Sequence, residues 1–153
     1  MSDPRNKLQS MFTEANRFGN FGRVITKLVI KGFRVHRDTT LRIESPITAI
    51  AGPNGGGKST IIELAAACYA GKFGGFQVSD FFAIGPLDRE PFSKTASVAV
   101  EYSKGDLKPQ ELTISRDDAA QRWRGYEDRP EKPVLFVEAG RHIPRRERVD
   151  DFY

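Results

Sequence analysis

The feature that most constrains this chain is a glycine-rich stretch, residues 52–59, which reads Gly-Pro-Asn-Gly-Gly-Gly-Lys-Ser. It matches the pattern G-x-x-x-x-G-K-[ST], in which glycines let the backbone wrap around a phosphate and turn successive N–H groups toward it. An apolar run, residues 47–51, comes directly before it, and apolar residues at helical spacing follow. Strand, loop and helix are the context that the pattern requires, so the stretch predicts a nucleotide phosphate-binding loop rather than a chance glycine-rich turn.

Each part of this loop has an expected task. Lys58 can reach the β- and γ-phosphates of a nucleotide as a flexible positive charge. Ser59 offers a hydroxyl to Mg²⁺, and the helix that begins there directs the positive end of its dipole at the anion. The residues expected to bind the nucleotide from this stretch are Asn54, Gly55, Gly56, Gly57, Lys58, Ser59 and Thr60.

Hydrophobic periodicity predicts an α/β domain. Two β-rich runs, residues 24–30 and 39–44, favour adjacent strands, and residues 47–51 favour a central strand that leads into the loop. Ile61, Ile62 and Leu64 begin a helical pattern that predicts a helix over residues 59–70, ended by Gly71.

The second half of the chain predicts further strands. Ala96, Val98, Val100 and Tyr102 alternate strictly with more polar residues. Polar turns at residues 104–106 and 117–118 separate this strand from two others, so residues 95–126 are expected to form an antiparallel meander. The apolar run Val134–Val137 predicts a buried strand, residues 1–20 a polar N-terminal segment with a short helix, and residues 21–153 the domain itself.

Composition limits the class of protein. The 153 residues are 39% hydrophobic and 29% charged, which fits one domain with a core and excludes a disordered chain. No apolar run approaches the roughly 18 residues of a membrane helix. The first residues lack the pattern of a secretory signal, and a lone Cys68 favours a reducing compartment, so we expect a cytoplasmic protein without a membrane partner. The net charge of +4 suits a phosphate-bearing ligand but does not by itself indicate nucleic-acid binding.

The segment 25–71 resembles the start of the ATPase head shared by RecF, SMC proteins and OLD-type ATPases, a branch of the ABC ATPase superfamily. Such heads begin with a strand of the form L-x-I-x-x-F-[RK], continue with a second strand, and reach G-x-N-G-x-G-K-S through a third. The matching residues are Leu28, Ile30, Phe33, Arg34, Gly52, Asn54, Gly55, Gly57, Lys58 and Ser59. Small kinases and GTPases usually have one strand before the loop, whereas this chain has two strands and then a third.

The resemblance implies ATP and Mg²⁺ as cofactors, with Ser59 at the magnesium and Arg34 close to the nucleotide. A solvated arginine at the end of a strand is the other interpretation of Arg34. The implied fold is a phosphate-loop NTPase: the N-terminal lobe of an ABC-type ATPase, with a mixed sheet and an antiparallel β-subdomain, in a chain that looks truncated. The family further implies a homodimer or larger oligomer formed through ATPase heads. DNA or an effector nuclease is the implied partner, and DNA repair, chromosome maintenance or antiphage defence the implied context.

Several family features have no clear match in the sequence. We find no LSGGQ-like signature, and Val134–Val137 followed by Glu138 and Ala139 is only an imperfect Walker B strand, which a core strand explains better. We therefore expect the isolated chain to bind ATP with little hydrolysis. Gln77, Gln110 and Gln121 are equal candidates for the glutamine loop.

For the remaining histidines, the tryptophan and a cluster of arginines, we expect structural or solvated positions rather than a role in binding. His36 and His142 are expected to be structural or surface histidines. Trp123 is expected to pack within a strand rather than stack on a base. The cluster Arg141, Arg145, Arg146 and Arg148 is expected to be a solvated charged segment rather than a phosphate contact.

Two functions of other classes stay open. One is a stand-alone phosphate-loop kinase or GTPase with Glu138 as its magnesium partner, although the base-reading N-K-x-D of GTPases is absent from the sequence. The other is a module without catalysis, in which bound nucleotide only controls assembly.

Overall fold

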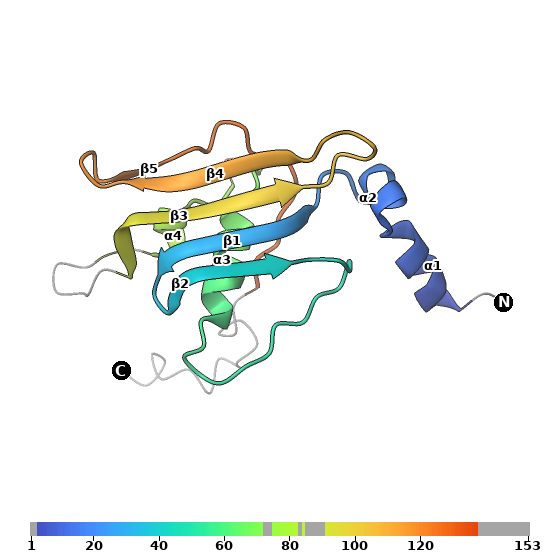
Figure 1. Ribbon diagram of the computed structural model, residues 1–153, viewed down its shortest axis with the longest axis horizontal. Helices are drawn as coiled ribbons and strands as arrows, with labels where there is room; N and C mark the ends of the chain where they lie inside the picture. Colours follow the sequence, from blue (N-terminus) through green and yellow to red (C-terminus); the bar gives the residue numbers. More distant parts are fainter. Residues whose placement is uncertain (1–2, 72–74, 83, 85–90, 138–153) are drawn as a thin grey trace, which may run out of the picture.

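The computed structural model describes residues 3–71, 75–82, 84 and 91–137. These residues form one antiparallel sheet, with α3 and α4 on one of its faces and the N-terminal helices α1 and α2 beyond one end of its strands (Figure 1). The helices are α1 (Pro4–Met11), α2 (Glu14–Phe21), α3 (Lys58–Ala67) and α4 (Val78–Phe81). The strands are β1 (Ile25–Phe33), β2 (His36–Arg42), β3 (Phe92–Tyr102), β4 (Gln110–Asp117) and β5 (Arg122–Arg124).

The core lies between the sheet and α3. Leu28 of β1 and Val98 of β3 are buried on the face that α3 covers, together with Leu64 of the helix itself. In β3 Phe92 is buried, and so are Ala96, Val98, Val100 and Tyr102, which confirms the strand predicted from the alternation of these last four. One apolar face on the sheet and one on α3 thus produce a two-layer α/β arrangement.

The strands join in a single sheet of order β2-β1-β3-β4-β5. The predicted meander is present as β3, β4 and β5, and the predicted adjacent pair is present as β1 and β2. However, β1 also pairs with β3, with Leu28 opposite Val100, so the meander is not a separate layer and the described sheet is antiparallel rather than mixed. Both edges of β1 are paired, which satisfies its backbone groups on either side.

Two predicted strands are absent from the part of the chain that the structure describes. Residues 47–51 form no ladder, and Ile47 is 76% exposed. The run Val134–Val137 is also outside the sheet, with Leu135 84% exposed, so the predicted buried strand is wrong there. A strand needs a hydrogen-bonded neighbouring strand as well as β propensity. Neither segment has such a neighbour among the described residues.

The helix predicted over residues 59–70 ends earlier, at Ala67. The guanidinium of Arg129 donates from Nη1 to the carbonyls of Ala67 at 2.9 Å, Tyr69 at 3.1 Å and Phe76 at 2.7 Å. The bonds to Ala67 and Tyr69 satisfy carbonyl groups that have no helical partner where α3 stops. The negative end of the helix dipole also favours the positive guanidinium at this position. Because Arg129 lies more than 60 positions away, helical periodicity does not predict this end.

The turn after α3 buries two ionisable groups. Burial raises the pKa of the Cys68 thiol to about 12, and burial likewise raises the pKa of Tyr69 to about 12. The Tyr69 hydroxyl accepts a hydrogen bond from the backbone N–H of Ile25 at 3.0 Å, while Tyr102 donates to the Cys68 carbonyl. The aromatic pair Tyr69 and Tyr102 therefore fastens the end of α3 to β1 and β3.

Two short helices precede the sheet. Asp3 caps α1 by accepting from the N–H of Arg5 at 2.9 Å, and Gly22, with φ of 66°, ends α2. Lys132 donates from Nζ to the Phe21 carbonyl at 3.0 Å and ties α2 to the segment after β5. Within the described ranges, no helix has the length and apolar character needed to cross a membrane.

Candidate nucleotide-binding site

The glycine-rich loop leads directly into α3. Gly57 is the N-cap of this helix, with φ of 80° and ψ of 13°, and Gly55 has φ of 78°. Both values lie in the left-handed region that favours glycine. A Cβ on Gly57 would also lie 2.2 Å from His36 Nε2, whereas a Cβ on Gly55 would meet open space. Gly57 is therefore required by its backbone angle and by the close approach of His36.

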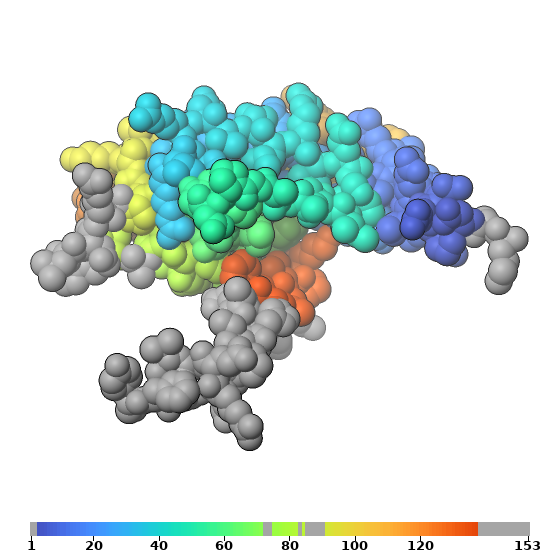
Figure 2. All heavy atoms as spheres, turned by 90° about the horizontal axis from the view of Figure 1, so that it is seen from below, coloured from blue at the N-terminus to red at the C-terminus, as the bar shows by residue number. Residues whose placement is uncertain are grey.

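The first turn of α3 faces a cavity of about 500 Å³. The cavity is lined by Arg34, Val35, Asn54, Gly55, Gly57, Lys58, Ser59 and Thr60. No side chain caps the N-terminus of α3 in the described contacts. The first N–H groups of the helix are thus available to an anion, which the helix dipole favours. In Figure 2 the green atoms of this loop lie at the surface beside the cyan atoms of the β1–β2 hairpin.

Lys58 bends back over its own loop. Its Nζ donates to the carbonyls of Gly52 and Pro53, each at 2.8 Å. The ammonium group carries three donors and sits on a flexible stem, so it can exchange these carbonyls for phosphate oxygens without movement of the helix.

Arg34, which follows β1, lines the same cavity. It has φ of 47° and its backbone N–H donates to the Pro91 carbonyl at 2.7 Å. The guanidinium donates from Nη1 to the Thr60 hydroxyl at 3.3 Å, lies 3.8 Å from Glu63 Oε2, and stacks 4.9 Å from the centre of the Phe82 ring. Arg34 therefore combines features of both sequence interpretations. It lies at the end of a strand, and it lines the cavity of the loop.

His36 supports the loop from the sheet, a role that the sequence does not reveal. The side chain is 6% exposed, with Nδ1 3.0 Å from the Thr39 hydroxyl and Nε2 3.0 Å from the Gly57 carbonyl. The prediction of a structural histidine agrees with this burial. A sequence signal for the contact with Gly57 is lacking, because segment 43–51, which is neither helix nor strand, separates β2 from the loop.

Ser59 belongs to two cavities at once. Besides the cavity described above, it lines a second one of about 400 Å³ together with Glu63, Asp80 and Phe81. Asp80 already accepts from the backbone N–H of Gln77 at 2.7 Å and so caps α4. Among the described residues there is no group of three or more His, Cys, Asp or Glu placed to hold a metal ion.

The three candidate glutamines each have structural contacts in the described part of the chain. Gln77 caps α4, Gln110 donates to the Asp128 carbonyl at 2.9 Å, and Gln121 accepts from Arg116 at 2.6 Å. None of the described contacts joins one of them to residues 52–60.

Trp123 packs inside the fold. Its ring stacks on Phe33 with the centres 5.3 Å apart and the planes at 16°, and it meets Phe92 edge-on at 5.1 Å. One face of the indole is therefore covered by protein, in agreement with the predicted packing role. Glu138, His142 and the arginines at 141, 145, 146 and 148 lie outside the described residues.

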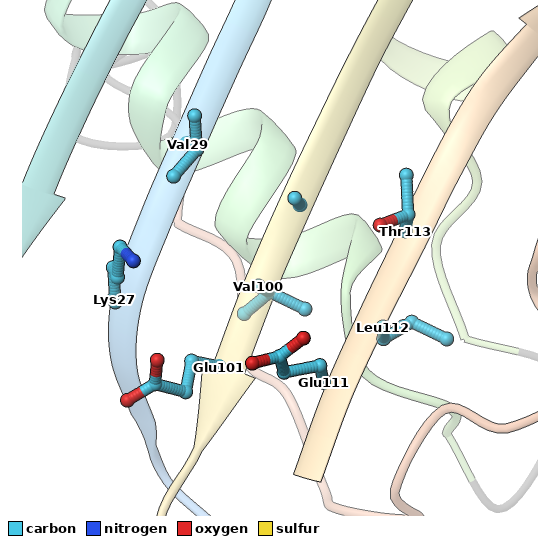
Figure 3. Close-up of a pocket in the computed structure, with 8 residues that line it drawn as sticks. Lys27, Val29, Val100, Glu101, Glu111, Leu112 and Thr113 are labelled. Atoms are coloured by element: carbon cyan, nitrogen blue, oxygen red, sulfur yellow. The ribbon is translucent and has the colours of Figure 1, made fainter. Parts of the chain in front are cut away.

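A shallow hollow of about 120 Å³ lies on the opposite face of the sheet (Figure 3). Lys27, Glu101 and Glu111 line it from β1, β3 and β4, while α3 lies behind the strands. The hollow has carboxylates beside its lysine, which does not favour an anion, and it is not lined by any residue of the loop. Residues 52–60 and Arg34 are therefore the better candidate site.

Comparison with known proteins identifies the family. Residues 27–133 match the AAA domain family AAA_23. The chain is 33% identical over 101 residues to the chromosome partition protein Smc of Mycobacterium leprae (strain TN), and 34% identical over 102 residues to Smc of Mycobacterium tuberculosis (strain ATCC 25618 / H37Rv). Each match covers 60% of this chain and 8% of the relative.

A further match, to Smc of Halothermothrix orenii, is 52% identical over 40 residues, or 26% of this chain and 3% of the relative. The match to these two mycobacterial Smc proteins thus covers more than half of this chain but only about 8% of their length. Because the family match covers most of the chain, including all five strands in part or whole and the glycine-rich loop, the chain belongs to the AAA_23 family of AAA domains and represents the N-terminal region of an SMC/RecF-type ATPase head.

Proposed function

We propose that this chain binds ATP together with Mg²⁺ as the phosphate-holding lobe of an SMC/RecF-like ATPase. The observation that supports this most is the single cavity formed by the left-handed Gly57, the open N-terminus of α3, Lys58 and Arg34. Glycine backbone, helix dipole and two positive side chains converge there, and a polyphosphate is the ligand with the complementary charge and shape.

Each residue has a role in this proposal. The backbone N–H groups of residues 55–60 hold the phosphates, and Lys58 leaves its loop carbonyls to reach the β- and γ-phosphates. Arg34, held by Thr60 and Phe82, adds charge from the side of the sheet. The hydroxyl of Ser59 is the protein ligand for Mg²⁺, which shields the phosphate charge when it is bound. A hard oxygen ligand on a cavity wall fits this ion, since Mg²⁺ is usually held by few protein groups, phosphates and water.

The isolated chain is proposed to bind ATP with little hydrolysis. In-line attack of water on the γ-phosphate requires a group that orients the water. Glu63 and Asp80 line the second cavity beside Ser59, but Glu63 lies beside Arg34 and Asp80 caps α4. In the complete protein, we propose that two heads close around ATP and hydrolyse it.

The proposed cellular role is coupling of this ATP cycle to DNA. The matched relatives are chromosome partition proteins, which favours chromosome maintenance or DNA repair over antiphage defence through an effector nuclease. The proposed partner in either case is a second ATPase head, with DNA or the effector recruited by the assembled protein.

A fluorescent ATP analogue tests the proposal directly. We expect binding that requires Mg²⁺, is competed by ATP better than by GTP, and is lost by at least tenfold in Lys58→Ala and Ser59→Ala. Lys27→Ala, on the opposite face of the sheet, is the matched control and should bind like the wild type. Equal affinity in Lys58→Ala would refute the site. Preferential GTP binding would favour a GTPase, and stoichiometric phosphate release abolished in Lys58→Ala would refute the expected lack of hydrolysis.

A further inference from the structure

The β1–β2 hairpin provides both side-chain hydrogen bonds that fasten residues 52–60 to the sheet in the described part of the chain. Arg34 donates to Thr60, and His36 contacts Gly57. Thr60 lies within α3, whereas Gly57 is the last residue of the loop and the hinge point where the helix begins. The contact of His36 is therefore the one that acts on the loop itself.

The partners of the His36 ring determine its protonation pattern. The carbonyl of Gly57 can only accept, so Nε2 carries the hydrogen and donates to it. In the neutral ring Nδ1 then accepts from the Thr39 hydroxyl. Both nitrogens are thus used, and the ring, which is 6% exposed, has its orientation fixed from β2.

The Gly57 carbonyl accepts a second hydrogen bond besides the one from His36. The same Gly57 oxygen accepts from the backbone N–H of Ile61 at 3.2 Å, which is the first hydrogen bond of α3. A donor on this oxygen fixes the peptide plane after Gly57, and that plane sets the direction of the next N–H, which belongs to Lys58. Of the neighbouring glycines, Gly55 is exposed and Gly56 donates only within the loop, to the Pro53 carbonyl at 3.1 Å. In the described contacts, the loop is therefore tied to the sheet through Gly57.

We infer that His36 is a positioning residue that holds the phosphate-binding loop ready for nucleotide by donating from Nε2 to the Gly57 carbonyl. The inference deepens the proposed function and rests on it for its nucleotide readout. His36 touches no phosphate in this arrangement; it acts through Gly57. Its contribution is to keep the loop in one conformation before the ligand arrives, which lowers the cost of ordering on binding.

Two variants at His36 separate the hydrogen bond from the packing. His36→Leu fills much of the same space without a donor, and His36→Gln keeps an amide N–H that can reach the Gly57 carbonyl. We expect His36→Leu to weaken binding of the ATP analogue about tenfold, because the hydrogen bond from Nε2 to the Gly57 carbonyl is lost. His36→Gln should stay within about threefold of the wild type, whereas a purely structural role would make the two variants similar.

Hydrogen exchange without nucleotide tests the inference independently of the proposed function. In His36→Leu the amides of residues 54–61 should exchange about tenfold faster than in the wild type, while those of β3 and β4 stay unchanged. If the wild type binds no ATP, the proposed function fails and the exchange result still decides this inference. Unchanged exchange of residues 54–61 in His36→Leu would overturn it.

A second position covers the case in which His36→Leu does not fold. Thr39→Val removes the hydroxyl that orients the ring and keeps the β-branched shape, and Thr39→Ser restores the hydroxyl. Thr39→Val should raise loop exchange about threefold, with Thr39→Ser and Thr40→Val as controls that resemble the wild type. A neutral ring shown by ¹⁵N NMR to carry its hydrogen on Nδ1 would also overturn the inference, because Nε2 then has nothing to donate.

Discussion

Arg34 Nη1 lies 3.3 Å from the hydroxyl oxygen of Thr60, and this bond joins the end of β1 to the first turn of α3. The cavity that Arg34 lines is also lined by Lys58, the first residue of α3. A ligand with several negative charges would therefore meet one cation from the sheet and one from the helix.

Removal of the Arg34 charge should weaken ATP binding. In Arg34→Ala we expect the dissociation constant to rise about tenfold, because a partly solvated positive charge near the phosphates is lost. Arg34→Lys keeps the charge but not the stacking on Phe82, so it should recover part of the affinity. Titration with a fluorescent ATP analogue measures both. Arg37→Ala, on an exposed position of β2, is the control, and an equal loss there would mean that only general charge matters.

Alanine at Gly57 should be far more damaging than alanine at Gly55. Both residues have φ near 80°, so each substitution carries the left-handed backbone cost of about 1–2 kcal/mol. Only at Gly57 does the new Cβ collide with His36, at 2.2 Å. Urea unfolding should therefore show a larger loss of stability for Gly57→Ala, along with loss of nucleotide binding. Equal unfolding midpoints for the two variants would contradict the packing described around His36.

Arg129 should be among the most important residues for stability. Its three hydrogen bonds are charge-assisted: two go to the Ala67 and Tyr69 carbonyls at the end of α3 and one to the Phe76 carbonyl before α4. Arg129→Ala leaves these carbonyls without that donor. We expect a loss of about 3 kcal/mol in the free energy of unfolding, measured by urea denaturation. Arg122→Ala, at an exposed position of β5, should change stability by less than about 0.5 kcal/mol. A similar small effect at Arg129 would show that water replaces its bonds.

The fold should lose stability at alkaline pH. The pKa of Cys68 is raised to about 12 from 9.0 and that of Tyr69 to about 12 from 10.0, both through burial. Because the folded pKa values exceed the unfolded ones, this stability is fully present below pH 9 and is lost as the pH rises toward 12. Urea unfolding between pH 8 and pH 11 measures the slope, which Cys68→Ala should reduce.

The same burial predicts an inert thiol. At pH 8 the native chain should react with a thiol reagent only as fast as it opens, whereas the urea-unfolded chain should react at once. Fast labelling of the native chain at Cys68 would contradict the burial of this residue behind α3.

Much of the fold can be predicted from local pattern. The alternation of Val98 and Val100 identifies β3, the apolar residues after Lys58 identify α3, and polar turns separate the strands of the meander. These signals are local because a side chain's face is set by the period of its own element. The loop residues 52–59 can be predicted for the same reason, since the glycines encode the backbone angles directly.

Local pattern thus predicts the glycine-rich loop, the helix after it and most of the strands. The pairing of β1 with β3, the position of residues 47–51 outside the described sheet and the contacts of Arg129 at the end of α3 depend on segments that are far apart in the chain. The contact between His36 and Gly57 is of the same kind. Local propensity sets backbone angles within an element, whereas a hydrogen-bond partner from a distant segment is present only once the chain has folded.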